Sequence, residues 1–513
     1  MTNRITGLNS GLDTESLITA LTQTYQTRVD KQTGGQTRLS WKQDIWKSTN
    51  KNIVSFYNGK LSDMRFSTAF NKKTSKASSN AVTITTGDSA MLSTSTVSKT
   101  SLAKASYLTG NKVYKSGTTD LATKDTTMSE LGITDDTTIS FNMGGTTDGS
   151  DALSISISAS DTMSDVISKL NSATSTSGLG ITANYDANQG RIYISSEKTG
   201  EDYAFTVDTS TGAEALSALG INTDSLDDSS QYQAASDAQL VMNGVTYTSA
   251  SNTFEVNGLS ISINSSTDEE FTITTSNDTS GVYDMVKEYL SEYNSLIQKL
   301  DTLYNADKAD SYDILTSDQK EEMTEDEISE WNTKIKTGLL AKDSTLYNVI
   351  QALKEAMQGT YSVTDSNGNT STWSLSTLGI NTKGYFEAEE NERGVYHIDG
   401  DDDDDYSRTN TDKLASAIAS DPDAVASFFT QLSRTVYSKL GDLMKGTTYS
   451  SAYTVYEDKL MASQYSDYNT KISKAEEDLE KKQDYYYSKF AAMEKALSKI
   501  NSSSSSLGSM LGS

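Results

Sequence analysis

The sequence predicts an α+β multi-domain protein, with a helical coiled-coil stalk formed by both chain ends, a discontinuous helical domain and two inserted β-rich head domains. Apolar residues recur at helical spacing near both ends, alternate with period two through the middle, and return to helical spacing after it. A chain of 513 residues is also longer than one hydrophobic core usually supports. Several separate cores are therefore expected.

The N-terminal segment is predicted to be a helix from Thr14 to about Lys31, because its apolar residues recur every four positions. Asp13 or Thr14 is placed to cap its start. The Gly34-Gly35 pair is expected to interrupt this helix, after which a second helical pattern continues towards Phe66. The residues of the first stripe are Leu17, Leu21, Tyr25 and Val29.

The middle of the chain, from Ala77 to about Ser276, is predicted to form strands, so the first helical block is expected to end near Lys76. A single helix interrupts these strands, and Asp161 is its predicted N-cap. Turn residues between positions 185 and 191 predict a hairpin loop. The apolar residues of the helix, at i, i+3, i+4 and i+7, are Met163, Val166, Ile167 and Leu170.

Two similar short segments, 130–133 and 218–221, are interpreted as the brackets of an inserted subdomain. Four domains are predicted from these changes of period. They are a terminal coiled-coil stalk (1–42 and 455–513), a helical leg domain with a small β-hairpin region (43–76 and 279–454), a β-rich head domain (77–109 and 235–278) and an outer β-rich head domain with one helix (110–234).

The second half of the chain is predicted to return to helices at Val282 and again after Asp343. A hairpin is expected around positions 367–369. Pro422, with Asp421 as its cap, is predicted to open another helix, because proline suits the first helical position.

The C-terminal segment has a thin apolar stripe with 3,4 spacing over several heptads, broken only by Lys482. Such a helix cannot bury its stripe alone and needs a partner helix from the same chain or from another copy. The N-terminal stripe is the candidate within the chain. The predicted stalk and oligomer contacts of the tail are Tyr468, Ile472, Ala475, Leu479, Lys482, Tyr486, Phe490, Met493, Leu497 and Ile500.

The composition of the chain argues against several classes of partner and of chemistry. The net charge of −27 repels nucleic-acid phosphates and anionic membranes. The absence of cysteine removes disulfides and thiolate chemistry, and no apolar run is long enough to insert into a membrane. The first residues lack the apolar core of a cleaved signal peptide, so export without cleavage is expected.

Catalytic chemistry has few candidates. His397 is the only histidine and lies in a predicted strand, which favours a structural side chain over a general base. The acidic run 401–405 lacks the glycine and spacing of an EF-hand, so a solvated loop is favoured over a calcium site. Chance pairs of carboxylates are expected among 70 acidic residues, and the separation that glycoside hydrolysis needs is three-dimensional, so such pairs in the sequence are no signal of that activity. We therefore expect neither an enzyme nor a bound cofactor or metal, and a secreted glycosidase remains the enzyme alternative.

Several segments, in order along the chain, carry a family resemblance. They are Ile5–Asp13 with Ser16–Ile18, Trp41–Gln43 with Phe66, Asp237–Gly244, Ser251-Asn252 to Asn257-Gly258, and the tail Tyr487–Asn501 with Ser506-Leu507. Together they resemble the bacterial flagellar filament capping proteins, the flagellar hook-associated protein 2 family. Two departures are Gly34-Gly35, where the family has continuous helix, and the run 401–405, which resembles a local insertion.

The resemblance implies a homo-oligomeric cap, a pentameric ring at the filament tip outside the cell, that helps exported flagellin fold and insert and prevents its loss. It implies flagellin, the flagellar export machinery and an export chaperone as partners. Two alternatives remain at this point. One is a tip adhesin that binds host mucin or epithelium through its β-rich domains, and the other is a flagellin or hook–filament junction protein.

Overall fold

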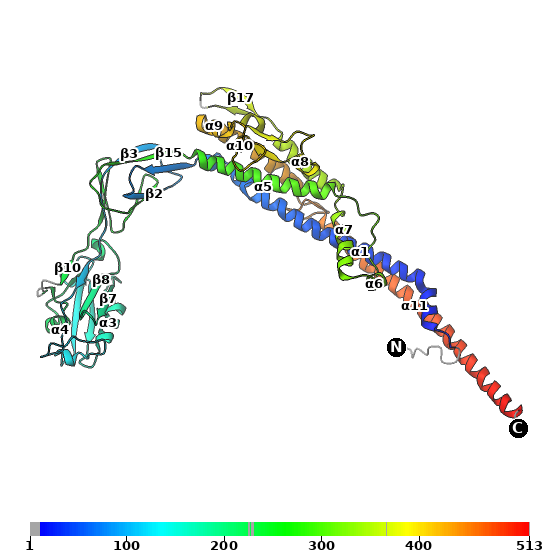
Figure 1. The fold of residues 1–513 in the computed structure, drawn as a ribbon, viewed down its shortest axis with the longest axis horizontal. Coiled ribbons are helices and arrows are strands. Elements are labelled where there is room, and N and C mark those ends of the chain that lie inside the picture. The colour runs from blue at the N-terminus through cyan, green and yellow to red at the C-terminus, as the bar shows by residue number, and fades with distance from the viewer. Residues whose placement is uncertain (1–10, 224–225, 227–229, 366, 512–513) are drawn as a thin grey trace. The chain divides into compact units, whose positions relative to one another are not determined.

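The computed structural model describes residues 11–223, 226, 230–365 and 367–511. Contacts divide the chain into two compact units, a helical unit from the two ends (up to Phe70 and from Thr279) and a β-rich unit, Asn71–Asp278 (Figure 1). The predicted combination of helical ends with a β-rich middle is therefore confirmed.

The helical unit begins with α1, Thr14–Asn58, whose start is capped by Asp13 as predicted. The carboxylate of Asp13 accepts from Ser16 N at 3.0 Å and from Ser16 Oγ at 2.6 Å. The predicted break at Gly34-Gly35 is wrong, because α1 is one continuous helix of 45 residues. Glycine costs roughly 1 kcal/mol in a helix interior, but packing along the helix outweighs that preference.

Further helices complete this unit, and between them lie two small hairpins. The helices are α2 (Lys60–Asp63), α5 (Thr279–Asn305), α6 (Ser317–Glu321), α7 (Glu325–Thr337), α8 (Ser344–Met357), α9 (Lys413–Ser420), α10 (Pro422–Leu443) and α11 (Asp458–Leu511). The hairpins pair β16 (Tyr361–Thr364) with β17 (Thr370–Trp373) and β18 (Ile380–Thr382) with β19 (Tyr396–Ile398). The hairpin around 367–369 and the start of α10 at Pro422, with Asp421 as its cap, agree with prediction.

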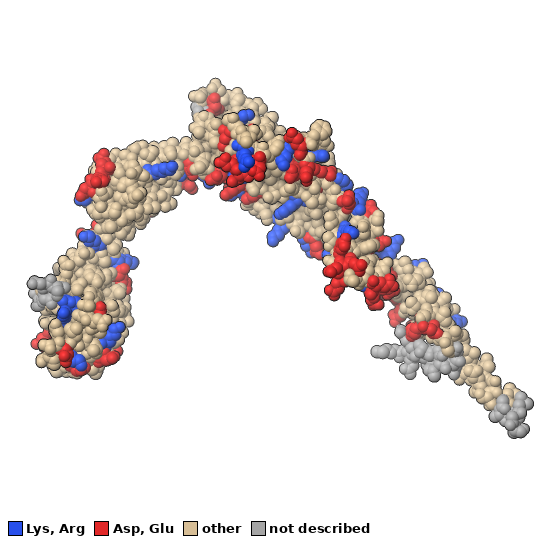
Figure 2. Space-filling view, in the orientation of Figure 1, with Lys and Arg blue, Asp and Glu red and all other residues tan. Residues whose placement is uncertain are grey.

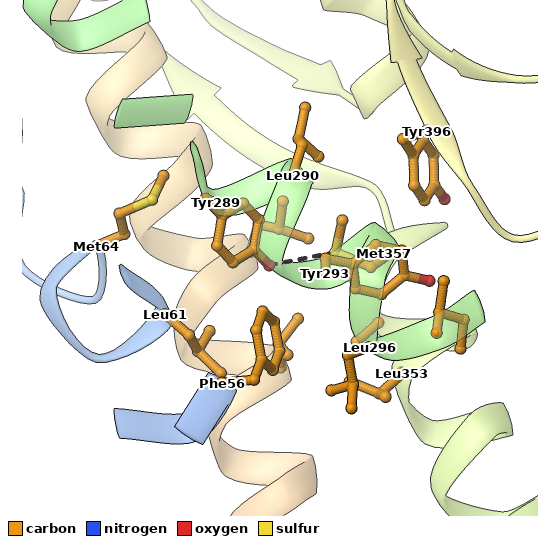
Figure 3. Packing of buried hydrophobic residues seen from close by; sticks show 14 of the residues in the cluster. Phe56, Leu61, Met64, Tyr289, Leu290, Tyr293, Leu296, Leu353, Met357 and Tyr396 are labelled. Atoms are coloured by element: carbon orange, nitrogen blue, oxygen red, sulfur yellow. Dashed lines mark hydrogen bonds between the residues drawn. The ribbon is translucent and has the colours of Figure 1, made fainter. Parts of the chain in front are cut away.

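The core of the helical unit is built around two fully buried tyrosines of α5 (Figure 3). The hydroxyl of Tyr289 lies 3.2 Å from Sδ of Met357. The hydroxyl of Tyr293, one turn further along, has no hydrogen-bond partner among the described residues. Burial therefore raises the pKa of both hydroxyls well above the usual range.

Replacing Tyr293 by phenylalanine is expected to raise the free energy of unfolding of the helical unit by about 1 kcal/mol, because a buried donor without a partner is removed. Replacing Tyr289 by phenylalanine is the matched control and should give no gain, since that hydroxyl has a partner. Urea unfolding followed by helical circular dichroism measures both. A loss of stability in the Tyr293 variant would contradict the assignment.

The β-rich unit starts at β1, Lys73–Ala77, so the predicted end of the helical block near Lys76 is wrong. The ladder between β1 and β15 already begins at Lys73, opposite Asn277, and extended pairing replaces helix there. The remaining strands are β2 (Val82–Thr86), β3 (Ser93–Ser101), β4 (Tyr107–Thr109), β5 (Thr137–Met143), β6 (Ala152–Ile157), β7 (Ile181–Asp186), β8 (Arg191–Ser196), β9 (Phe205–Val207), β10 (Gln231–Gln233), β11 (Ala238–Met242), β12 (Val245–Ser249), β13 (Thr253–Val256), β14 (Leu259–Ile263) and β15 (Phe271–Asn277).

These strands form two separate cores in the part of the unit that the structure describes. The first core lies between the sheets β1-β15-β3-β11-β12 and β13-β14-β2. The second, from the inserted segment, lies between β10-β4-β8-β7 and β6-β5-β9. The insertion opens at β4 and returns at β10, which pair with each other. The four predicted domain limits remain predictions at residue level.

The described part of the inserted segment contains the α-helices α3 (Met163–Ser172) and α4 (Ala213–Ala218). The predicted N-cap of α3 at Asp161 is wrong. Thr162 caps it instead, in a capping box in which Asp165 N donates to its hydroxyl at 3.2 Å and Thr162 N donates to the Asp165 carboxylate at 2.9 Å. Asp161 accepts from Ser158 N and Lys169 Nζ. The predicted apolar face is confirmed, with three residues buried and Ile167 packed against the same core.

Candidate functional site, the terminal helix pair

The helices α1 and α11, here called the terminal helix pair, lie side by side and run antiparallel (Figure 1). Near one end the ring of Trp46 stacks on Tyr456, with centroids 5.3 Å apart and an interplanar angle of 9°. Towards the other end, the Tyr487 hydroxyl donates to Glu15 Oε2 at 2.5 Å. Residues with higher numbers in α1 therefore contact residues with lower numbers near the start of α11, as in an antiparallel pair. Helix α1 is therefore the partner of the tail helix α11 within the chain.

As far as Tyr486, the stripe predicted on α11 lies where α11 packs on α1, and its last members lie beyond the described start of α1. Its members are half-buried, whereas most residues between them are exposed. The half-buried members are Tyr468, Ile472, Ala475, Leu479, Lys482, Tyr486, Phe490, Met493 and Leu497. Ile500 is different, because 62% of it is exposed. Whether these residues also form contacts between copies stays a prediction.

The stripe on α1 is only partly as predicted. Val29 is buried and Tyr25 is half-buried, but Leu17 and Leu21 are 40% and 47% exposed. A strict spacing of four residues drifts by about 40° a step around a helix of 3.6 residues per turn, which carries these two leucines off the seam.

Ile18 and Thr22 fill the seam instead, and the sequence reasoning missed them. The Thr22 hydroxyl donates to the Ile18 carbonyl at 2.8 Å, so its burial leaves no unpaired donor. The sequence did contain a signal for these two residues. Positions 18, 22, 25 and 29 are separated by four, three and four residues, and a seam between two helices repeats every 3.5 residues on average.

Lys482, the charged residue in the tail stripe, rests on aromatic rings. Its Nζ lies 5.8 Å from the ring centroid of Tyr25 and 5.4 Å from that of Tyr485. Its stem covers apolar surface while the ammonium group meets ring faces, which explains how a lysine fits the seam.

Gly35 allows α11 to approach α1 closely. A Cβ atom at position 35 would lie 2.7 Å from the Tyr468 hydroxyl oxygen and 2.8 Å from its Cε1. At Gly34 the nearest atom would be Cβ of Ile314, at an ordinary 3.4 Å. Gln36, the next residue, donates to Asn469 Oδ1 at 2.6 Å.

Replacing Gly35 by leucine is expected to lower the free energy of unfolding of the helical unit by about 1–3 kcal/mol, because the new side chain displaces Tyr468 from the seam. Replacing Gly34 by alanine, the matched control, should raise it by about 0.5–1 kcal/mol, since glycine is a poor helix former. Urea unfolding by circular dichroism distinguishes them. Equal effects of the two substitutions would show that no close approach at position 35 matters.

The segment that contains α6 and α7 packs beside α1 and was not predicted. Lys336 Nζ lies 4.7 Å from the Trp41 ring centroid, and Arg38 donates to the Tyr312 carbonyl. Figure 2 shows acidic side chains gathered over α6 and α7. Both helices begin with a capping box, at Thr316 and Thr324, and that Thr-x-x-Gln/Glu signature was readable from the sequence.

The single histidine and the acidic run form a structural cluster. His397, on β19 as predicted, lies 2.6 Å from Asp404 Oδ2 through its Nδ1. Lys287 Nζ lies 2.6 Å from Asp401 and 2.7 Å from Asp403. Burial raises the pKa of Asp404, but its hydrogen bonds, with His397 first, outweigh burial and hold it below the usual range. Among the described residues, no group of His, Asp and Glu side chains could hold a metal ion.

Comparison with known protein families shows which family this chain belongs to. A family model described as the flagellar hook-associated protein 2 C-terminus matches residues 235–502, more than half of the chain. The chain belongs to the flagellar hook-associated protein 2 family. The N-terminal model of the same family matches residues 10–106, and a flagellin hook IN motif matches 138–198. The matches include nearly all of the terminal helix pair, whereas Ile5–Ser10 of the resembling motif lies outside the described residues.

Relatives in this family cover most of the chain. Flagellar hook-associated protein 2 of Halalkalibacterium halodurans is 24% identical over 453 residues, 82% of this chain and 78% of the relative. That of Escherichia coli K12 is 24% identical over 514 residues, 98% of this chain and 96% of the relative. A crystal structure of the D1-D2-D3 domains of the Escherichia coli flagellar cap protein FliD has a TM-score of 0.49 and 22% identity, and covers 78% of this chain and 94% of that one.

Proposed function

We infer that this chain is a structural cap at the distal end of the bacterial flagellar filament. The family match over residues 10–106 and 235–502, which includes nearly all of the terminal helix pair, carries this conclusion. The cap holds the growing end, promotes the folding and insertion of exported flagellin and prevents its loss. Filament elongation and motility depend on it.

The terminal helix pair is the surface we assign to docking on the filament. Leu17, Leu21 and Ile500 lie on the outside of the pair, where they add apolar contact area without contributing to its seam. Each leucine or isoleucine buried in a partner surface contributes about 1.5–3 kcal/mol. Such a face suits transient docking to other helices.

Several copies of the chain are proposed to form the cap, as a ring with five members on the filament. Flagellin, the export machinery and an export chaperone are its proposed partners, and the filament tip outside the cell is its proposed location. No described helix combines the length and apolar character needed to cross a bilayer. Neither the mucin-binding adhesin nor the hook–filament junction protein is favoured by the family match.

Deletion of the gene in its host tests the proposal. Cells are expected to keep hooks, to lack filaments and to release unpolymerised flagellin into the medium, and the full-length chain supplied in trans should restore filaments. Electron microscopy and immunoblots of the medium measure both effects. Intact filaments in the deletion strain would exclude a cap function.

A further inference from the structure

A loop between β18 and β19 carries two neighbouring exposed aromatic residues, Tyr385 and Phe386, here called the aromatic knob. Phe386 is 98% exposed and Tyr385 is 65% exposed. Their ring centroids are 5.5 Å apart and their planes are perpendicular. Single exposed apolar residues are normal on protein surfaces, but two adjacent aromatic rings at the tip of one loop form a patch.

Two contacts within the loop itself support the aromatic knob. The guanidinium group of Arg393 lies 4.2 Å from the Tyr385 ring centroid. Lys383 Nζ forms an ion pair with Glu392 at 3.0 Å. These contacts hold the knob in place before any partner arrives, which lowers the entropy lost on binding.

A groove of the right size lies in the same helical unit, between α1 and α5. It is an open depression on the surface with a volume of about 350 Å³, so an aromatic side chain would rest in it with one side towards solvent. Phe56 and Leu296 form its apolar floor, the small side chains of Ser55 and Ser295 leave the space open, and Lys299 lies on the rim.

The aromatic knob and the groove lie on different sides of α5. The region around the knob contacts α5 through Asn294, which donates to the Tyr396 carbonyl at 2.7 Å, and Asn305, which donates to Asn391 at 3.2 Å. At 100° per residue, Asn294 and Asn305 lie about 100° and 80° around α5 from Ser295. The segment that carries the knob therefore contacts a different face of α5 from the one that lines the groove.

We propose that the aromatic knob of one copy inserts Phe386 into the α1–α5 groove of a neighbouring copy. This inference rests on the proposed function, which places several copies at one filament tip. Knob and groove are different surfaces, so the contact is heterologous and repeats head to tail, which closes a ring when the rotation permits. An isologous pair would use the same surface twice and stop at two copies.

The charges beside the aromatic knob and beside the α1–α5 groove favour the knob of a second copy as the group that occupies the groove. Exposed Glu387 and Glu389 flank the knob, and Lys299 on the groove rim makes no ion pair within the described part of the chain. Glu292 also lines the groove, but its Oε2 accepts from Lys60 N at 3.3 Å. Burial, the largest influence, raises the pKa of that carboxyl above its usual value.

Cysteine cross-linking tests the contact directly, because the natural chain has no cysteine. A full-length chain with E387C and S295C, which keeps the Phe386 ring, is used to complement the deletion strain, and sheared filaments are oxidised and run without reductant. A disulfide needs Cα atoms within about 7 Å. We expect a ladder of covalent multimers from the double variant, and none from either single variant or from the matched pair E387C with S463C, whose second cysteine lies on α11.

Sedimentation of the purified chain is the second measurement. F386A should weaken self-association by about tenfold to a hundredfold, whereas Y449A, which removes another exposed aromatic ring of the helical unit, should leave it within about twofold. Filaments that grow without a ladder above the control pair, or an F386A variant that associates normally, would overturn the contact and leave the cap function intact. Filament growth in the deletion strain without any chain would instead overturn the proposed function.

Discussion

Replacing Trp46 by alanine is expected to lower the free energy of unfolding of the helical unit by about 3–5 kcal/mol, the usual loss when a buried tryptophan is truncated. Trp46 is buried and stacks on Tyr456, just before α11 begins. The cavity left behind lies at the junction where the chain enters the tail helix. Both the core and one end of the terminal helix pair should loosen.

Trp41 provides the matched control for this experiment. It lies five positions earlier on α1, is only half-buried and contacts Lys336 across its ring face. Its replacement by alanine should lower the free energy of unfolding by about 1 kcal/mol, in the range of a partly exposed cation–π contact. Urea unfolding followed by circular dichroism compares the two, and a similar loss for both would contradict the role given to Trp46.

A chain ending at Ser498 is expected to fold normally but fail to support filament growth. The described part of α1 begins at Thr14, and its Glu15 already meets Tyr487, so the last turns of α11 extend past it. Ile500 and Leu507 are 62% and 58% exposed there. Their removal should change the free energy of unfolding by less than about 0.5 kcal/mol, while it removes apolar surface assigned to docking.

Point variants separate this effect from shortening of the helix. Ile500 and Leu507 are both replaced by serine in one chain, and Ser503 and Ser504 are both replaced by alanine in the control. The first variant should leave short filaments or none in the deletion strain, and the control should restore normal length. Normal growth with the first variant would remove these two residues from the docking surface.

The sequence predicted best where one local signal agreed with the packing. Pro422 after Asp421 favours the start of a helix, and the apolar 3,4 spacing on α11 identified its half-buried residues apart from Ile500. Prediction failed where tertiary contacts outweighed local preference. The Gly34-Gly35 pair, considered alone, favours a break in the helix. In the structure α1 is continuous there, and glycine at position 35 leaves room for the ring of Tyr468 to pack against it.

Other features had no usable local signal. Leu17 and Leu21 match an apolar spacing as well as Ile18 does, and only the position of α11 decides which of them is buried. The exposure of Phe386 and the groove at Ser295 depend on how distant segments pack in the helical unit. A sequence pattern cannot distinguish an apolar residue of the core from one at a loop tip when the loop has no periodicity.

The central claim is that this chain caps the distal end of the filament, and its position on the filament tests it most directly. Antibodies against the chain, coupled to gold, are applied to intact cells and viewed by electron microscopy, with the deletion strain as the blank. The account predicts gold at the distal filament ends alone. Gold along the filament shaft, or at the junction between hook and filament, would contradict it.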